Sequence, residues 1–130
     1  MRNDNKMSVH LLQHLKTQLL VFFDELISIM PSEKDFIVIR FFIKDQVPIA
    51  DVMQYIIDKL VPLEDFVLRK DDRFFLEHQV LFEDLKDHDS KVNYFKNLWL
   101  SSTDEDNKQA IWNWFKHFID IGKRYRASTQ

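Results

Sequence analysis

Hydrophobic residues recur every three or four positions along most of the chain, a spacing that predicts α-helices. We expect the first helix to begin at Val9 with Ser8 as its N-terminal cap, and to end at Pro31. One half of this helix is apolar: Val9, Leu11, Leu12, Leu15, Leu19, Leu20, Phe22, Phe23, Leu26, Ile27 and Ile29. The other half carries His10, Gln13, His14, Thr17, Gln18, Asp24, Glu25 and Ser28, so it is expected to face solvent or a partner.

Residues 36–43 form an apolar run whose pattern fits two structures. Its β-branched residues would suit a buried strand, whereas Ser32 and Asp35 resemble a capping box at the start of a helix. We prefer the helix, which would be apolar on nearly every side and therefore typical of a central position in a bundle. Its narrow polar stripe is made up of Glu33, Arg40 and Lys44.

Arg40 interrupts this apolar run and can be interpreted in two ways. A buried guanidinium would need a carboxylate partner. Alternatively, its long side chain reaches the surface beside Glu33 and Lys44, which is the interpretation that we prefer.

Further helices are predicted in the apolar segments that lie between prolines or short polar stretches. One should follow Pro48 and run over residues 49–61 up to Pro62, and a short one should follow over residues 63–69. A turn is expected at Asp71 and Asp72, followed by broken helical pieces over residues 74–85. Ser90 can cap another helix over residues 91–100.

The last helix is expected to start after Thr103 and to run to about Tyr125. Acidic residues 104–106 favour its positive N-terminal end, and basic residues complement the opposite end. Its apolar residues span a full half of the helix, wider than an ordinary surface helix needs, with Gly122 in the middle. We therefore predict a partner-binding surface here, with these candidate contacts: Trp112, Trp114, Ile121, Tyr125, Lys116, Lys123, Arg124 and Arg126.

These elements together predict an all-α fold, a single compact bundle of about six or seven helices. The 130 residues are 45% hydrophobic, enough for the core of one domain. Three prolines and one glycine are too few for the many tight turns of a β-sandwich. We expect a flexible N-terminal segment over residues 1–7, the helical domain over residues 8–126 and a flexible C-terminus over residues 127–130.

Composition leaves little room for catalysis. Without cysteine there can be no disulfide, thiolate metal site or cysteine nucleophile, and a single glycine cannot build a phosphate loop or a nucleophile elbow. His10 and His14 have a spacing that could share a metal, but no third ligand is evident. The acidic residues 83–89 fit a solvated connection better than a cation site. We predict no enzyme, and no catalytic, cofactor or metal site.

Charge is distributed unevenly over a chain whose net charge is −3. This net negative charge argues against nucleic acid as a partner. Acids prevail over residues 63–89 and bases over residues 111–130. No apolar stretch of about 20 residues is free of charge, and the start lacks the apolar core of a signal peptide. We expect neither a membrane span nor secretion.

Several segments resemble a small, uncharacterised helical family of large nucleocytoplasmic DNA viruses of algae and protists. They are Val92-Asn-Tyr-Phe-Lys-Asn-Leu-Trp99, Thr103-Asp-Glu-Asp106, Ala110-Ile-Trp-Asn-Trp-Phe115, Phe23-Asp-Glu-Leu-Ile-Ser-Ile-Met-Pro31 and Asp45-Gln-Val-Pro-Ile-Ala-Asp-Val-Met53. The resemblance implies a virus-encoded, non-enzymatic helical protein, located in the particle or in the cytoplasm of the infected host. The resemblance does not assign a catalytic role to any residue of this chain.

Three functional hypotheses remain. The first is a structural or scaffolding protein that packs against viral or host proteins, or against further copies of itself, as a minor capsid-associated component of the virion. The second is a regulatory module that binds a helix of another protein in a groove. The third is a nucleic-acid accessory protein whose basic last helix contacts phosphates.

Overall fold

The computed structural model describes residues 2–71 and 104–129, and every regular element in these ranges is helical. The α-helices are α1 (Arg2–Ile29), α2 (Lys34–Asp45), α3 (Ile49–Tyr55), α4 (Glu64–Leu68) and α7 (Glu105–Ser128). A π-helical turn, η1 (Ile56–Leu60), and a 3₁₀ turn, η2 (Val61–Leu63), connect α3 to α4. The predicted all-α class is confirmed. The predicted count of six or seven helices also depends on residues 72–103, which lie outside the described ranges.

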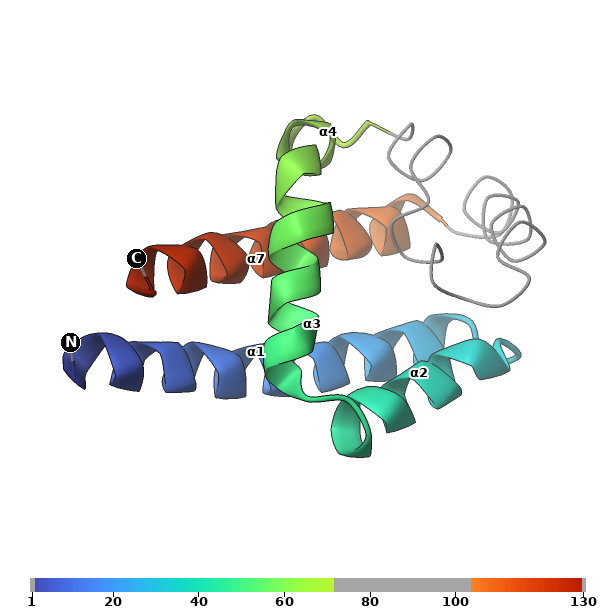
Figure 1. Cartoon of the computed structure of the whole chain (residues 1–130). Helices are drawn as coiled ribbons and strands as arrows, with labels where there is room; N and C mark the ends of the chain where they lie inside the picture. The colour runs from blue at the N-terminus through green and yellow to red at the C-terminus, as the bar shows by residue number, and fades with distance from the viewer. Residues whose placement is uncertain (1, 72–103, 130) are drawn as a thin grey trace.

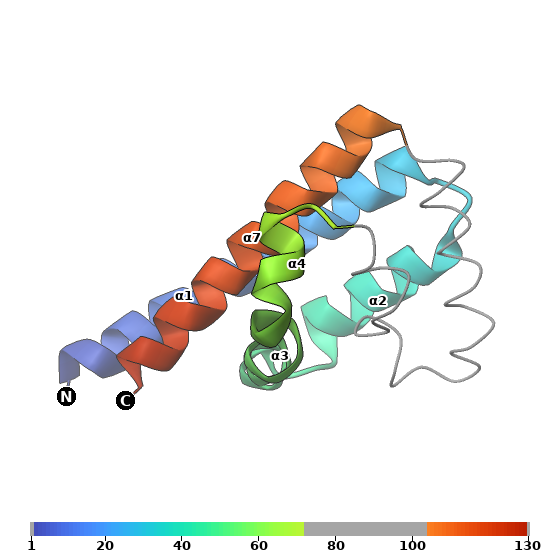
Figure 2. The same cartoon turned by 90° about the horizontal axis from the view of Figure 1, so that it is seen from above.

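The two longest helices in the described ranges, α1 and α7, pack against each other (Figure 1). α1 and α7 lie side by side and run in opposite directions, so that the two chain ends meet; the hydroxyls of Ser8 and Ser128 are 3.1 Å apart. α2 folds back along α1, and the segment from α3 to α4 runs across both long helices. The view from above shows this crossing segment over the α1–α7 pair (Figure 2).

The buried side of α1 follows the predicted spacing. Five of its apolar residues are buried in the core: Leu11, Leu15, Leu19, Phe22 and Leu26. The helix ends at Ile29, just before Pro31, as predicted. However, it already begins at Arg2, so Ser8 lies within the helix and is not its cap. The expected flexibility of residues 1–7 stays a prediction.

α2 is a helix rather than a strand, which confirms the preferred alternative. Only Phe36 and Ile43 of α2 are buried, and among the described elements α2 packs mainly against α1. Its expected central position also depends on residues 72–103, which lie outside the described ranges, and therefore stays a prediction. The predicted capping box is wrong, because the cap position is Glu33 and no side chain bonds to the first turn. An all-round apolar pattern does not specify how many neighbours a helix has.

Arg40 on α2 has a carboxylate partner on α1. Its Nε atom lies 2.7 Å from Oδ1 of Asp24, and its Nη2 atom donates a hydrogen bond to Oδ2 at 3.3 Å. The Arg40 side chain is 30% exposed, so the pair lies at the edge of the α1–α2 contact. Arg40 therefore combines the two interpretations: it has the carboxylate partner expected of a buried guanidinium, while its side chain as a whole is only partly buried.

Pro62 changes the helical geometry of the crossing segment instead of ending it. The chain passes from α3 through the wide turn η1 and the tight turn η2, which contains Pro62, into α4. α4 matches the short helix predicted over residues 63–69. It ends where Lys70 adopts a left-handed conformation with φ of 52°. The Asp71 N–H then bonds to the Phe66 carbonyl at 2.9 Å, which places the turn at residues 69–70, earlier than predicted.

α7 begins at the acidic residues 104–106, which were predicted to favour its N-terminal end. The cap is Asp104, whose carboxylate accepts a hydrogen bond from the Asn107 N–H at 2.8 Å, rather than the predicted Thr103. The helix ends at Ser128, three residues beyond the predicted end, so the first part of the expected C-terminal tail is helical. The helices predicted over residues 74–85 and 91–100 and the acidic residues 83–89 lie outside the described residues.

Candidate interaction surfaces

The wide apolar half of α7 is used by two neighbours within the molecule. α1 packs against one part of it, and the segment formed by η1, η2 and α4 packs against another. Two of the candidate partner contacts are consequently buried: Trp112 is 4% exposed and Ile121 is 0% exposed. This corrects the sequence-based hypothesis for both residues, because a side chain enclosed in the core presents no surface to another protein.

Trp114 belongs to an aromatic cluster at the α1–α7 contact. The Phe22 ring lies at its centre, with ring centroids 5.7 Å from Trp114, 5.8 Å from Phe115 and 5.3 Å from Phe118. Trp114 is half-buried, and its indole N–H donates a hydrogen bond to the Glu25 carboxylate at 2.6 Å. The indole thus already satisfies its donor within the molecule, as half-buried tryptophans commonly do.

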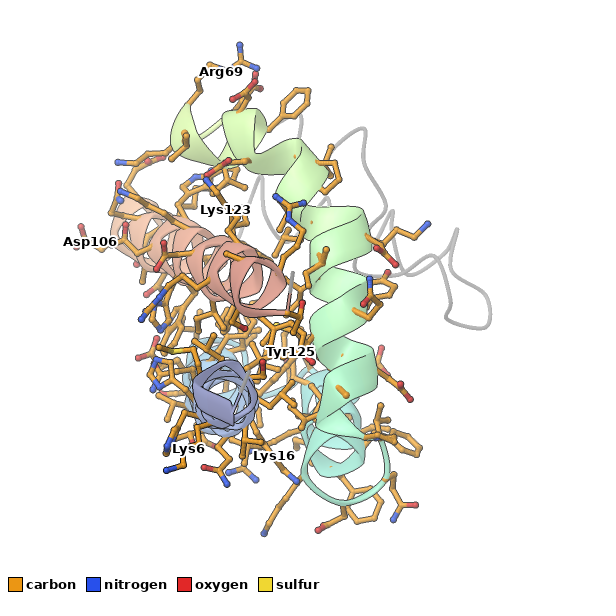
Figure 3. The ribbon with its side chains drawn as sticks, turned by 60° about the vertical axis from the view of Figure 1, so that its left-hand side comes forward. Lys6, Lys16, Arg69, Asp106, Lys123 and Tyr125 are labelled. Atoms are coloured by element: carbon orange, nitrogen blue, oxygen red, sulfur yellow. The ribbon has the colours of Figure 1, made fainter. Side chains whose placement is uncertain are left out.

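Gly122 lies where the crossing segment packs closely against α7. A methyl group at this position would be 3.1 Å from Cγ2 of Ile56 and 3.4 Å from Cγ2 of Val61. Tyr125, one turn further on, is half-buried and packs against the core (Figure 3). The middle of the apolar half of α7 is therefore an internal contact as well.

The basic candidates on α7 are exposed but differ in their surroundings. Lys123 forms an ion pair with Glu64 of α4, with Nζ 3.0 Å from Oε2 (Figure 3). Lys116 lines a shallow, open groove of about 390 Å³. The other residues that line it are Glu64, Leu68, Asn113, His117 and Asp120. Arg124 and Arg126 are exposed at the end of the helix. Acidic residues among these bases divide the positive surface into small parts.

His117 of α7 faces His14 of α1. The two imidazole rings stand edge to face with centroids 5.5 Å apart, and the His117 ring also contacts Trp114. Burial lowers the pKa of His117 below its usual value of 6.5, and the nearby His14 lowers this pKa further. Asp120 raises the pKa in part, and Arg124 lowers it again. The folded protein therefore disfavours a charged His117.

This lowered pKa predicts an acid-sensitive contact between α1 and α7. Between the folded-state pKa and 6.5, the unfolded chain binds more protons at His117 than the folded protein does. The stability that neutral His117 contributes should be present above pH 6.5 and lost as the pH falls through the folded-state pKa. We expect His117→Gln to make the unfolding free energy less dependent on pH in this window. Urea titrations of both proteins at a series of pH values measure the difference, and equal slopes would contradict it.

Metal binding and membrane insertion find no support among the described residues. In the ranges 2–71 and 104–129, no three histidine or acidic side chains are grouped so that they could hold a metal ion. His10 and His14 therefore gain no third ligand there. None of the helices in the described part of the chain is both long and apolar enough to cross a membrane.

Among the described residues, the largest group of neighbouring exposed apolar side chains lies on α2, a surface that the sequence did not lead us to expect. Four adjacent side chains on the outer side of α2 are about half exposed: Ile37 (50%), Val38 (49%), Phe41 (52%) and Phe42 (47%). We call these four residues the α2 outer face. The rings of Phe41 and Phe42 touch with centroids 5.9 Å apart. The signal was present in the all-round apolar pattern, which was interpreted as a sign of central burial.

This chain matched no protein-family model, no curated protein and no solved structure when it was compared with each of them.

Proposed function

We propose that the protein is a non-enzymatic helical scaffold that acts by packing against other protein molecules through the α2 outer face. The observation that carries this proposal is the exposure of four large, adjacent apolar side chains on one helix. Apolar groups gathered on a surface mark interaction sites, because covering them removes apolar area from water. Aromatic residues are also enriched in protein interfaces, and the α2 outer face contains two of them.

The residues on the other two candidate surfaces favour this proposal over a helix-binding groove and over a nucleic-acid interface. In the described part of the chain, the groove beside α4 is lined by five polar or charged residues and one leucine, so it offers few apolar side chains to the apolar face of an incoming helix. On α7, Lys116 shares its groove with Asp120, and Lys123 is paired with Glu64, so the bases do not form a continuous track for phosphates. The α2 outer face has neither disadvantage.

We propose more specifically that the protein is a minor component of a viral particle. This proposal rests on the resemblance of its sequence segments to the viral family. A scaffold in a particle would use an apolar helix face in the same way as a scaffold in the cytoplasm. The identity of the protein that contacts α2 distinguishes these locations.

Photo-crosslinking at position 41 tests the proposal. We replace Phe41 with a photoreactive phenylalanine derivative, which fits because the side chain is exposed and aromatic. The variant is made in the cells that naturally produce the protein and irradiated, and its adducts are identified by mass spectrometry. We expect adducts with a protein, either a second copy or another species. A structural protein of the particle as the adduct would support the viral proposal.

A matched control places the same photoreactive group at Asp120, which is exposed on the polar side of α7. We expect far less adduct from this position, because a charged and solvated surface is a poor core for an interface. Equal adducts at both positions, or lipid as the sole adduct at position 41, would contradict the proposal.

A further inference from the structure

We infer that the α2 outer face binds the same face of a second copy of the chain, with the two α2 helices antiparallel. This inference rests on the proposed function and names its partner. It starts from the position of α2, which packs against α1, buries Phe36 and Ile43 and leaves the α2 outer face exposed. Among the labelled helices, α2 lies to one side of the α1–α7 pair (Figures 1 and 2).

The pattern of residues on this face is symmetric about its own midpoint. Val38 and Phe41 are equally far from the point between Ile39 and Arg40, and so are Ile37 and Phe42. A two-fold axis through that point would place the apolar residues of one copy against those of the other. Symmetric dimers need such a self-complementary surface, because the same patch contributes both sides of the interface.

Charges at the two ends of the face specify the direction. At 3.6 residues per turn, Lys34 and Asp45 lie on the same side of the helix as the α2 outer face, one at each end. Both are exposed and equally far from the midpoint. An antiparallel pair would therefore place each Lys34 opposite the Asp45 of the other copy. A parallel pair would bring lysine to lysine and aspartate to aspartate.

The size of the face limits the strength of this association. A helix of 12 residues is about 18 Å long, so one face of it buries less than the roughly 800 Å² per partner of a standard interface. We therefore expect a reversible dimer that forms at high concentration. The apolar centre should supply most of its affinity, since exposed charge pairs contribute little and mainly set orientation.

Cysteine crosslinking of the full chain tests the arrangement. The chain contains no cysteine, so each introduced thiol is the sole one. Val38 lies near the inferred two-fold axis, whereas Lys34 of the two copies would be about 16 Å apart along the helix. We expect Val38→Cys to form a disulfide-linked dimer under mild oxidation and Lys34→Cys to stay monomeric. The reverse result would overturn the antiparallel arrangement.

Sedimentation of purified variants measures the association. We expect Phe41→Asp to weaken dimerisation at least about tenfold. Lys34→Glu and Asp45→Lys should each weaken it about threefold, and the double variant should recover the parent affinity to within about twofold. Ser28→Asp, an exposed change on α1, should have no effect. Circular dichroism verifies that each variant keeps its helical content.

The outcomes separate this inference from the proposed function. A parent protein that is monomeric at about 1 mM, together with no crosslink through Val38→Cys, would overturn self-association. If photo-crosslinking at position 41 still identified another protein, the scaffold proposal would stand without the dimer. Binding of the monomer to phosphatidylcholine–phosphatidylserine vesicles, abolished by Phe41→Asp, would overturn the inference in favour of a lipid surface.

Discussion

Phe22→Ala should lower the free energy of unfolding by about 3–5 kcal/mol, the largest effect that we expect from a single truncation. Phe22 is 5% exposed and lies at the centre of the aromatic cluster between α1 and α7. Its ring contacts those of Phe23, Trp114, Phe115 and Phe118. Removing the ring loses its transfer free energy and leaves a cavity that four rigid rings cannot readily fill.

Chemical denaturation followed by tryptophan fluorescence measures this loss. Because a domain of this size is typically stable by about 5–15 kcal/mol, Phe22→Ala should shift the midpoint strongly or unfold the protein. Phe41→Ala is the matched control, since the same substitution is made on another helix at a side chain that is 52% exposed. It should change stability by no more than about 0.5 kcal/mol. Equal losses in both variants would show that the α2 outer face is covered in solution.

Gly122→Val should have the second largest effect, a destabilisation of about 1–3 kcal/mol or more through overpacking. A methyl group at Gly122 would already lie 3.1 Å from Cγ2 of Ile56, closer than ordinary van der Waals contact. Valine adds two more carbons in the same space. α7 would have to move away from η1, and this movement would loosen the packing of the crossing segment on α7.

The control for this substitution is Ala127→Val, which adds valine at an exposed position of the same helix. It should cost only the difference in helix propensity, less than about 1 kcal/mol. The combination of Gly122→Val with Ile56→Ala tests the stated cause, because truncating Ile56 removes the carbon that clashes. We expect the double variant to be more stable than the sum of the two single effects predicts. Simple additivity would argue against a direct clash.

Much of the helical structure could be predicted because it depends on residues within one or two turns. Pro31 ends α1 through its own geometry, and the acids before α7 stabilise the positive end of that helix. Residues 36–43 are helical even though their β-branched run also suited a strand. The errors at Ser8, Ser32 and Thr103 all concern helix starts: α1 begins six residues before Ser8, α2 has no side-chain cap, and the cap of α7 is Asp104.

The candidate interaction surface was harder to predict because two helices carry more apolar surface than one packing contact needs. The periodicity of apolar residues was sufficient to predict that the described chain is helical, which side of α1 is buried and that α7 has an unusually wide apolar half. The packing of the helices, in contrast, was needed to see that α1 and the crossing segment cover α7 from two sides, while α2 keeps an exposed apolar face. Periodicity is a local property, and it gives only the width of an apolar face. What covers that face depends on contacts between residues far apart in the chain.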